Sequence, residues 1–199
     1  MSSPTFTMSL LSLFLLSLFA SIAQAQVPAD RTFKLVNQGE DGDNTVEYWA
    51  RYHMLFQVFA SPFQRGFYYN TPNEFTLALR MGLQSSDTVM PWVWEANRGN
   101  PVGENATFSL GRDGNLVLAE ADGQMAWQTN TANKGVVGFK LLSNGNMVLY
   151  DSKGKFVWQS FDYPTDTLLV GQSLLAGRVN KLISRLSREE NRNGPYSMV

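Results

Sequence analysis

The chain has 199 residues, of which 44% are hydrophobic and 13% aromatic, and this content excludes an intrinsically disordered protein. The net charge of −1 gives no electrostatic reason to expect binding to nucleic acid or to an anionic membrane. The absence of cysteine excludes thiol catalysis and cysteine metal sites.

The first 25 residues carry no charged side chain and include the apolar run MSLLSLFLLSLFASI. Ala23-Gln24-Ala25 has the small-x-small form of a signal-peptidase site. The run is too short to span a bilayer comfortably, and no second apolar run follows. We therefore predict a signal peptide over residues 1–25, cleavage before Gln26 and a secreted chain with no membrane span. An uncleaved anchor is the alternative, because no Lys or Arg precedes the run.

Residues 26–74 contain the aromatic stretch FQVFASPFQRGFYY, which predicts strands around a turn at Ser61-Pro62. The single histidine, His53, lies just before this stretch. A general-base role would need a nucleophile and an orienting carboxylate nearby, and none of the usual motifs is present. We therefore interpret His53 as non-catalytic and predict no metal site around it.

Two segments, Phe108–Thr129 and Phe139–Ser160, align without gaps. In each, Asp-Gly or Asn-Gly separates two apolar runs, which is a strong signal for a β-hairpin. A fainter third copy runs from Phe75 to Trp94, without the Gly-Asn pair. Each unit is too small to bury its own face, so the repeats predict three small sheets around one core that is filled by their recurring Phe, Leu and Trp.

The residues after Leu175 are ambiguous. Leu182, Ile183 and Leu186 have helical spacing, whereas isoleucine and serine also suit a strand. A loose basic run in this region comprises Arg178, Lys181, Arg185 and Arg188. Two glutamates follow it, so we interpret it as a solvated face, with contact to an acidic wall polysaccharide as the alternative.

The repeats resemble the bulb-type mannose-binding lectin domain of plants, the snowdrop-lectin family. WVWEANRGNPV (Trp92–Val102), DGNLVL (Asp113–Leu118) and VWQSFDYPTDTLL (Val157–Leu169) are similar to the versions in S-locus-type receptors and secreted glycoproteins. FYYNTPNEFTLALRMG is similar to the EP1-like group of epidermis-specific secreted glycoproteins. The resemblance implies an all-β fold, a β-prism of three four-stranded sheets with pseudo-threefold symmetry and a sugar site on each sheet.

In the family, a sugar site carries the pattern Gln-x-Asp-x-Asn-x-Val-x-Tyr. Alternate residues of a strand share a face, so the polar groups can divide the hydroxyls of one hexose while Val contacts its ring. In the Phe139 repeat Leu142 replaces Gln and Asn144 replaces Asp, and in the Phe108 repeat Gly111 replaces Gln and Ala119 replaces Tyr. The carbohydrate-binding residues that the resemblance implies are Asn144, Asn146, Val148 and Tyr150 in the Phe139 repeat, and Asp113, Asn115 and Val117 in the Phe108 repeat.

The pattern is therefore eroded. The Phe75 copy places Met81, Leu83 and Ser85 or their neighbours there and matches nowhere. Each lost hydrogen bond should cost roughly 0.5–1.5 kcal/mol, so two losses weaken a pocket about tenfold to a hundredfold. Gly145-Asn146 is also needed for the hairpin, whatever the function. A degenerate sugar site is our reading, with a scaffold that binds no sugar as the alternative.

The sequence contains no recognisable combination of catalytic residues. Asp162 and Asp166 flank Pro164, and paired carboxylates can run glycosidase chemistry. Aspartate beside proline and threonine is more typical of turns, where the side chain accepts backbone N–H bonds. We therefore predict a non-enzymatic protein that needs no cofactor and no metal.

The expected organisation is a signal peptide (1–25), an N-terminal β extension (26–66), the lectin domain (67–175) and a C-terminal extension or start of a second domain (176–199). The expected partners are mannose-containing glycans or cell-wall polysaccharide, bound weakly in the apoplast. Family lectins often pair by exchanging end strands, so a homodimer is an expectation too. The sequon Asn105-Ala106-Thr107 predicts a glycan on Asn105. The alternative function is a structural glycoprotein of the cell wall.

Overall fold

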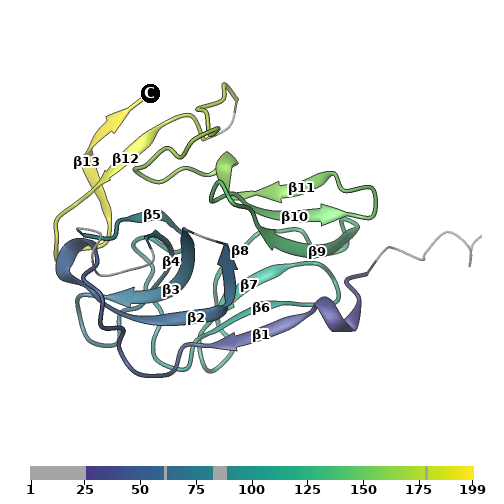
Figure 1. Ribbon diagram of the computed structural model, residues 1–199, viewed down its shortest axis with the longest axis horizontal. Helices are drawn as coiled ribbons and strands as arrows, with labels where there is room; N and C mark the ends of the chain where they lie inside the picture. Colours follow the sequence, from purple (N-terminus) through teal and green to yellow (C-terminus); the bar gives the residue numbers. More distant parts are fainter. Residues whose placement is uncertain (1–25, 61, 83–88, 178) are drawn as a thin grey trace, which may run out of the picture.

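The computed structural model describes residues 26–60, 62–82, 89–177 and 179–199, and these form strands joined by turns and three short 3-10 turns (Figure 1). The predicted signal peptide lies outside the described residues. Within them, no helix is long and apolar enough to cross a membrane. The strands are β1 (Phe33–Val36), β2 (Arg51–Ala60), β3 (Phe63–Tyr69), β4 (Thr76–Met81), β5 (Trp92–Glu95), β6 (Thr107–Leu110), β7 (Leu116–Ala119), β8 (Met125–Gln128), β9 (Val136–Leu141), β10 (Met147–Asp151), β11 (Phe156–Gln159), β12 (Leu182–Arg185) and β13 (Asn193–Met198). The 3-10 turns are η1 (Ala29–Arg31), η2 (Glu47–Trp49) and η3 (Ser160–Asp162).

Three antiparallel sheets surround one core. The first sheet has the order β2-β3-β4-β5, the second β1-β6-β7-β8 and the third β11-β10-β9. The all-β prism is confirmed, but the third sheet has three strands in the described chain, where the family resemblance implied four. Strands from before residue 67 belong to the first and second sheets, and the expected boundary after residue 66 falls inside β3.

The repeat predicted from Phe75 has a different register from the one that we expected. Each tryptophan faces a leucine of the neighbouring strand: Leu79 pairs with Trp94, Leu118 with Trp127 and Leu149 with Trp158. On the next strand, the residues opposite those leucines are Arg65, Phe108 and Phe139. Arg65, and not Phe75, therefore corresponds to Phe108 and Phe139. The connection between β4 and β5 is longer than its two counterparts, so spacing from the tryptophan misplaced the copy.

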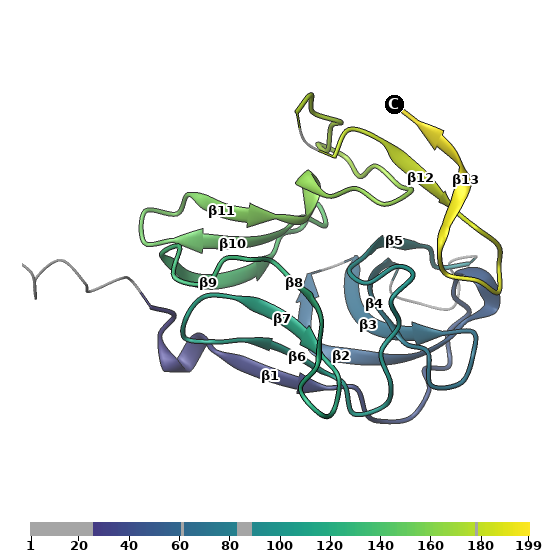
Figure 2. The same ribbon diagram turned by 180° about the vertical axis from the view of Figure 1, so that it is seen from behind.

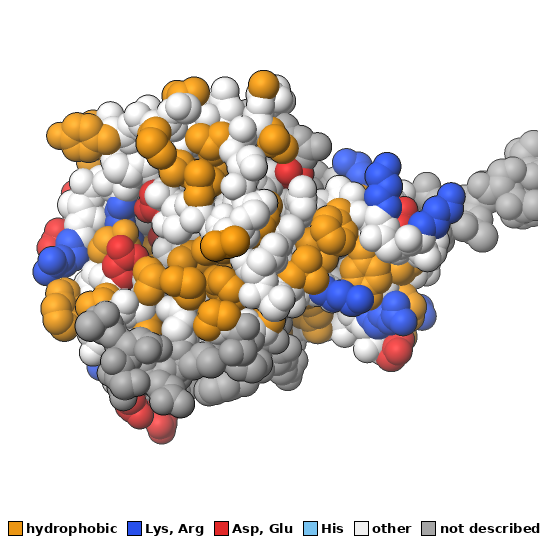
Figure 3. Space-filling view, turned by 45° about the horizontal axis from the view of Figure 1, so that its top comes forward, with side chains coloured by type: hydrophobic (Ala, Val, Ile, Leu, Met, Phe, Trp, Pro, Cys, Tyr) orange, Lys and Arg blue, Asp and Glu red, His pale blue; other side chains and the backbone are white. Residues whose placement is uncertain are grey.

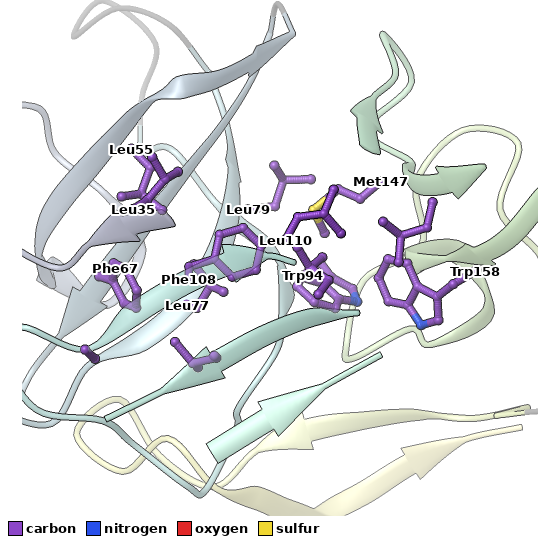
Figure 4. Packing of buried hydrophobic residues seen from close by; sticks show 14 of the residues in the cluster. Leu35, Leu55, Phe67, Leu77, Leu79, Trp94, Phe108, Leu110, Met147 and Trp158 are labelled. Carbon is purple, nitrogen blue, oxygen red and sulfur yellow. The ribbon is translucent and has the colours of Figure 1, made fainter. Parts of the chain in front are cut away.

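Three tryptophans mark the pseudo-threefold axis. The ring centroids of Trp94, Trp127 and Trp158 lie 5.8, 6.0 and 6.3 Å apart, and each pair meets edge to face. Such edge-to-face arrangements are the preferred ones for aromatic pairs. Trp94 and Trp158 lie at one end of the core, while Phe67 lies towards the other (Figure 4). The prediction that the recurring tryptophans fill the core is confirmed.

Arg65 breaks this symmetry inside the core. Its side chain is fully buried, and its guanidinium carbon lies 4.6 Å from the ring centroid of Phe108 and 4.7 Å from that of Phe139. Burial lowers the pKa of Arg65 to about 9, so the group is still charged at neutral pH. No described acidic residue forms an ion pair with it, and Nε and Nη1 have no hydrogen-bond partner there. Attraction to two aromatic faces is therefore the main compensation for its burial.

The first sheet is also covered on its outer face, by a second and smaller apolar cluster. Tyr68 stacks on Trp92 with 4.5 Å between ring centroids, and the guanidinium of Arg80 lies 4.8 Å from the centroid of Tyr52. The buried members are Val46, Ala50, Tyr52, Tyr68, Ala78, Met90 and Trp92. Because both of its faces are buried, β4 shows little alternation between buried and exposed residues.

The ambiguous C-terminal region forms the hairpin β12–β13, which lies outside the prism and beside the first sheet in both views (Figures 1 and 2). Arg185, from the predicted basic run, does not face solvent freely. Its guanidinium donates to the hydroxyl of Tyr68 at 2.6 Å and stacks 4.1 Å from the ring centroid of Tyr48. Arg178 of that run lies outside the described residues. Leu182–Arg185 of this region is thus a strand, and its basic end contacts the first sheet.

Candidate functional site

The outer face of the third sheet carries an open hollow. Along β10, Met147 and Leu149 point into the core, so Val148 and Tyr150 point to the opposite face. The hollow is lined by Arg31, Val137, Lys140, Leu142, Val148, Tyr150, Asp151, Ser152, Gly154 and Phe156. The structure therefore brings Val148 and Tyr150 together, with Val148 almost fully buried at the floor.

Asn144 and Asn146 do not line this hollow, because their side chains hold the hairpin together. The side-chain oxygen of Asn144 accepts the backbone N–H of Asn146 at 3.1 Å. The Asn146 amide donates to Oε1 of Gln159 at 3.0 Å, and its oxygen accepts from the Ser160 hydroxyl and the Phe161 N–H, both at 3.3 Å. Asn146 is only 4% exposed. Its polar atoms thus connect the turn to the chain that follows Trp158.

The second sheet repeats this arrangement. The carboxylate of Asp113 accepts the backbone N–H of Asn115 at 3.1 Å. The Asn115 amide donates to Gln128 at 2.6 Å, and its oxygen accepts the N–H of Thr131 at 3.1 Å. Val117 is half-buried on β7, but Ala119 stands where β10 has Tyr150, so this face has no aromatic wall.

Replacing Asn146 with alanine is expected to lower the free energy of unfolding by about 1–3 kcal/mol, because three partners lose their bonds inside the protein. Asn144→Ala is the matched control, since Asn144 is exposed and its side chain makes one local bond to the backbone. Urea unfolding of both variants measures the difference. An Asn146→Ala chain that is fully stable but loses glycan binding would instead assign Asn146 to ligand contact.

The described residues of the first sheet offer no comparable face. Thr76, Ala78 and Arg80 occupy the positions on β4 that Asn146, Val148 and Tyr150 occupy on β10, and all three are buried. The second apolar cluster covers them. Leu83 and Ser85, which the sequence placed in this copy, lie outside the described residues.

The residues that we considered for catalysis are engaged in structural contacts. Nδ1 of His53 lies 2.8 Å from the side-chain oxygen of Asn37, and Nε2 lies 3.6 Å from a carboxylate oxygen of Asp41. Asp166 pairs with Arg98 at 2.7 Å, and Asp162 accepts from the side-chain amide of Gln159 at 3.0 Å. In the described part of the chain, no group of three or more His, Cys, Asp or Glu is placed to hold a metal ion.

Sequence reasoning missed a buried ion network that joins β5 to the C-terminal hairpin. Arg98 contacts Glu95 at 2.6 Å and Asp166 at 2.7 Å, and it donates to the backbone oxygen of Ile183 at 2.9 Å. Burial opposes the charge on Arg98, but the two carboxylates outweigh this effect and raise its pKa. Glu95 directly follows Trp94, where the other two units have glutamine after the tryptophan, and that exchange was the available signal.

Asn105 lies in an exposed turn with a φ of 62°. Its side-chain oxygen accepts from the amide of Gln38 at 2.5 Å, and its backbone N–H donates to Asn37 at 3.0 Å. Exposure leaves the sequon accessible to a glycosyltransferase, and modification of Asn105 stays a prediction.

Comparisons with known proteins identify similar sequences. Residues 91–188 match the family model for the D-mannose binding lectin domain. The epidermis-specific secreted glycoprotein EP1 of Daucus carota is 68% identical over 173 residues, which cover 87% of this chain and 44% of the carrot protein. EP1-like glycoprotein 2 of Arabidopsis thaliana is 62% identical over 183 residues, which cover 90% of this chain and 40% of that protein.

This chain therefore spans less than half of the length of these relatives. Among solved structures, a monomeric monocot mannose-binding lectin from Gastrodia elata aligns with a TM-score of 0.34 and 18% identity, over 65% of this chain and 96% of that one. The name of the carrot relative describes that protein as secreted. Residues 91–188 are thus similar to the D-mannose binding lectin domain, and most of the chain is similar to the EP1-like glycoproteins of plants.

Proposed function

We propose that the protein is a secreted, non-enzymatic lectin-like glycoprotein that binds glycans through the hollow on the third sheet. One observation carries the proposal: the hollow is open and combines the floor of Val148 with the wall of Tyr150. The corresponding face of the first sheet is buried, and that of the second lacks the tyrosine. Among the residues that the structure describes, the third sheet is thus the one whose outer face is both open and lined by this tyrosine.

A single shallow site of this kind binds weakly, so useful binding needs several copies on one particle or one surface. Dense glycans of the plant cell wall, mannose-containing or otherwise, would supply such a surface. A homodimer would double the number of sites in each particle, and we propose it on the same ground. Glycosylation at Asn105 would leave this face free, because Asn105 is not among the residues that line the hollow.

The test is a glycan array probed with the chain from Gln26 onward. Tyr150→Ala is expected to abolish the binding that the unmodified chain shows, because it removes the aromatic wall. Tyr196→Ala is the matched control, since Tyr196 is 77% exposed on the C-terminal hairpin and lies outside the hollow. Binding that survives in the Tyr150 variant would move the site elsewhere.

A second function is favoured by one observation. The side chains of Asn115 and Asn146, the best matches to the sugar pattern, already form hydrogen bonds within the protein. A folded chain that binds no glycan on the array would therefore support a structural glycoprotein that uses the prism only as a scaffold.

A further inference from the structure

The side chains that line the hollow on the third sheet include several hydrogen-bond donors and few hydrogen-bond acceptors. Leu142 stands where the family pattern has glutamine, and Asn144 and Asn146 are turned into the hairpin. A neutral hexose presents hydroxyls that both donate and accept hydrogen bonds, so it is best held by amides, which also do both, and by carboxylates, which accept from its hydroxyls. Here most of the lining is apolar, with Val148 at the floor and Phe156, which is 45% exposed, at one side.

Two cations face this apolar surface. The ammonium of Lys140 lies 4.8 Å from the ring centroid of Tyr150, and Arg31 of η1 lines the same hollow. Neither forms an ion pair with another described residue. In the one carboxylate of the lining, Asp151, the oxygen Oδ1 accepts the backbone N–H groups of Lys153 and Lys155, each at 2.9 Å, and so stabilises the β10–β11 turn. Two cations are therefore left for a ligand.

The surface around the hollow is also apolar and bordered by basic side chains. On the face shown in Figure 3, Lys and Arg side chains border an apolar patch at the right-hand end of the molecule, where Figure 1 places β9–β11. The chain as a whole has a net charge of −1, so this concentration of positive charge is local. A local basic patch raises the concentration of anionic ligands near it.

A glycine on the neighbouring strand leaves room for the ring of Tyr150. Tyr150 lies opposite Gly138 in β9, and a Cβ at Gly138 would come within 2.5 Å of the tyrosine hydroxyl oxygen. Glycine inside a strand is unfavourable and marks a place where another group approaches closely. On the second sheet, Thr107 lies opposite Ala119, and Ser109 takes the place of Lys140. The described part of the second sheet therefore has neither this tyrosine nor the lysine beside it.

We infer that the hollow binds an acidic saccharide, a glycan that contains uronic acid, and this inference rests on the proposed function. Arg31 and Lys140 pair with the sugar carboxylate, because charge-assisted hydrogen bonds to carboxylate are stronger than neutral ones and guanidinium can form two at once. Tyr150 and Val148 contact the apolar face of the sugar ring. Mannose, which carries no charge, gains nothing from the two cations.

The experiment compares three probes on the chain from Gln26 onward: an oligogalacturonate, the same oligomer as its methyl ester, and a neutral mannan oligosaccharide. We expect the oligogalacturonate to bind most tightly and the methyl ester, which keeps the sugar but not the charge, to bind about tenfold more weakly. Lys140→Gln and Arg31→Gln should each reduce oligogalacturonate affinity about tenfold, which is more than they reduce mannan affinity. Lys140→Arg, which keeps the charge, should retain oligogalacturonate binding. Lys181→Gln is the matched control, because Lys181 is exposed and lies outside the hollow.

The outcomes separate the inference from the function on which it rests. Mannan binding that Tyr150→Ala abolishes, with no preference for the charged oligomer, would overturn the inference and leave the proposed function standing. Oligogalacturonate binding that Lys181→Gln weakens as much as Lys140→Gln does would overturn the inference too, since it would show diffuse attraction without a site. Binding of no probe by the folded chain would overturn both.

Discussion

Trp158→Ala is expected to lower the free energy of unfolding by about 3–5 kcal/mol. The indole is 6% exposed, meets the rings of Trp94 and Trp127 edge to face, and stacks on Tyr163 with 5.8 Å between centroids. The three rings meet where the three sheets meet, so the neighbours cannot close the cavity without moving a sheet. Guanidinium unfolding followed by circular dichroism measures the loss.

Trp49→Ala is the matched control, because Trp49 is 68% exposed. Substitutions at such surface positions usually change stability by no more than about 0.5 kcal/mol. Equal losses in the two variants would show that the tryptophan triad does not hold the prism together.

Arg98→Met should also destabilise the fold strongly, by about 3–5 kcal/mol, because it leaves two carboxylates without their buried partner. Glu95 is 5% exposed, and its second oxygen is hydrogen-bonded to the hydroxyl of Tyr68 at 2.5 Å. Chemical unfolding measures the total loss. Limited proteolysis of the hairpin β12–β13 tests its attachment, since Arg98 also holds the backbone of Ile183.

Two companion variants sharpen this test. Glu95→Gln together with Arg98→Met should recover part of the stability, because a neutral amide replaces the unpaired charge and glutamine already occupies this place in the other two units. Arg192→Met breaks an exposed ion pair with Glu190 and should change little. A double variant no more stable than Arg98→Met would assign the loss to packing of the long side chain.

The sequence predicted those parts of the fold that depend on residues close together in the chain. Asn-Gly and Asp-Gly turns between apolar runs predicted the hairpins of the second and third sheets, and both form. The register of the first sheet was wrong, because spacing from Trp94 assumed a connection as short as the other two. Nothing local indicated that a buried Arg65 takes the place of a phenylalanine, since its neighbours Phe108 and Phe139 come from distant strands.

In the candidate site, too, the sequence predicted some residues correctly and missed others. Alternation along β10 correctly predicted that Val148 and Tyr150 share a face. It failed for Asn146, which comes before the strand, where a polar side chain bonds to nearby turns and to the chain after the tryptophan. Lys140 and Arg31 could not be identified from the pattern, because they reach the hollow from β9 and η1. Only the pairing of strands shows that they are neighbours of Tyr150.

The pairing of β1 with β6 sets an order for assembly. Strands β2 to β5 form a meander of sequential neighbours, whereas Phe33 of β1 pairs with Leu110, on the far side of that entire meander. A ribosome releases the chain from its N-terminus, so the first sheet can complete itself while β1 still has no partner. Strand β1 must then wait for residues 107–110, and this late, long-range closure is the step at which folding should be slow.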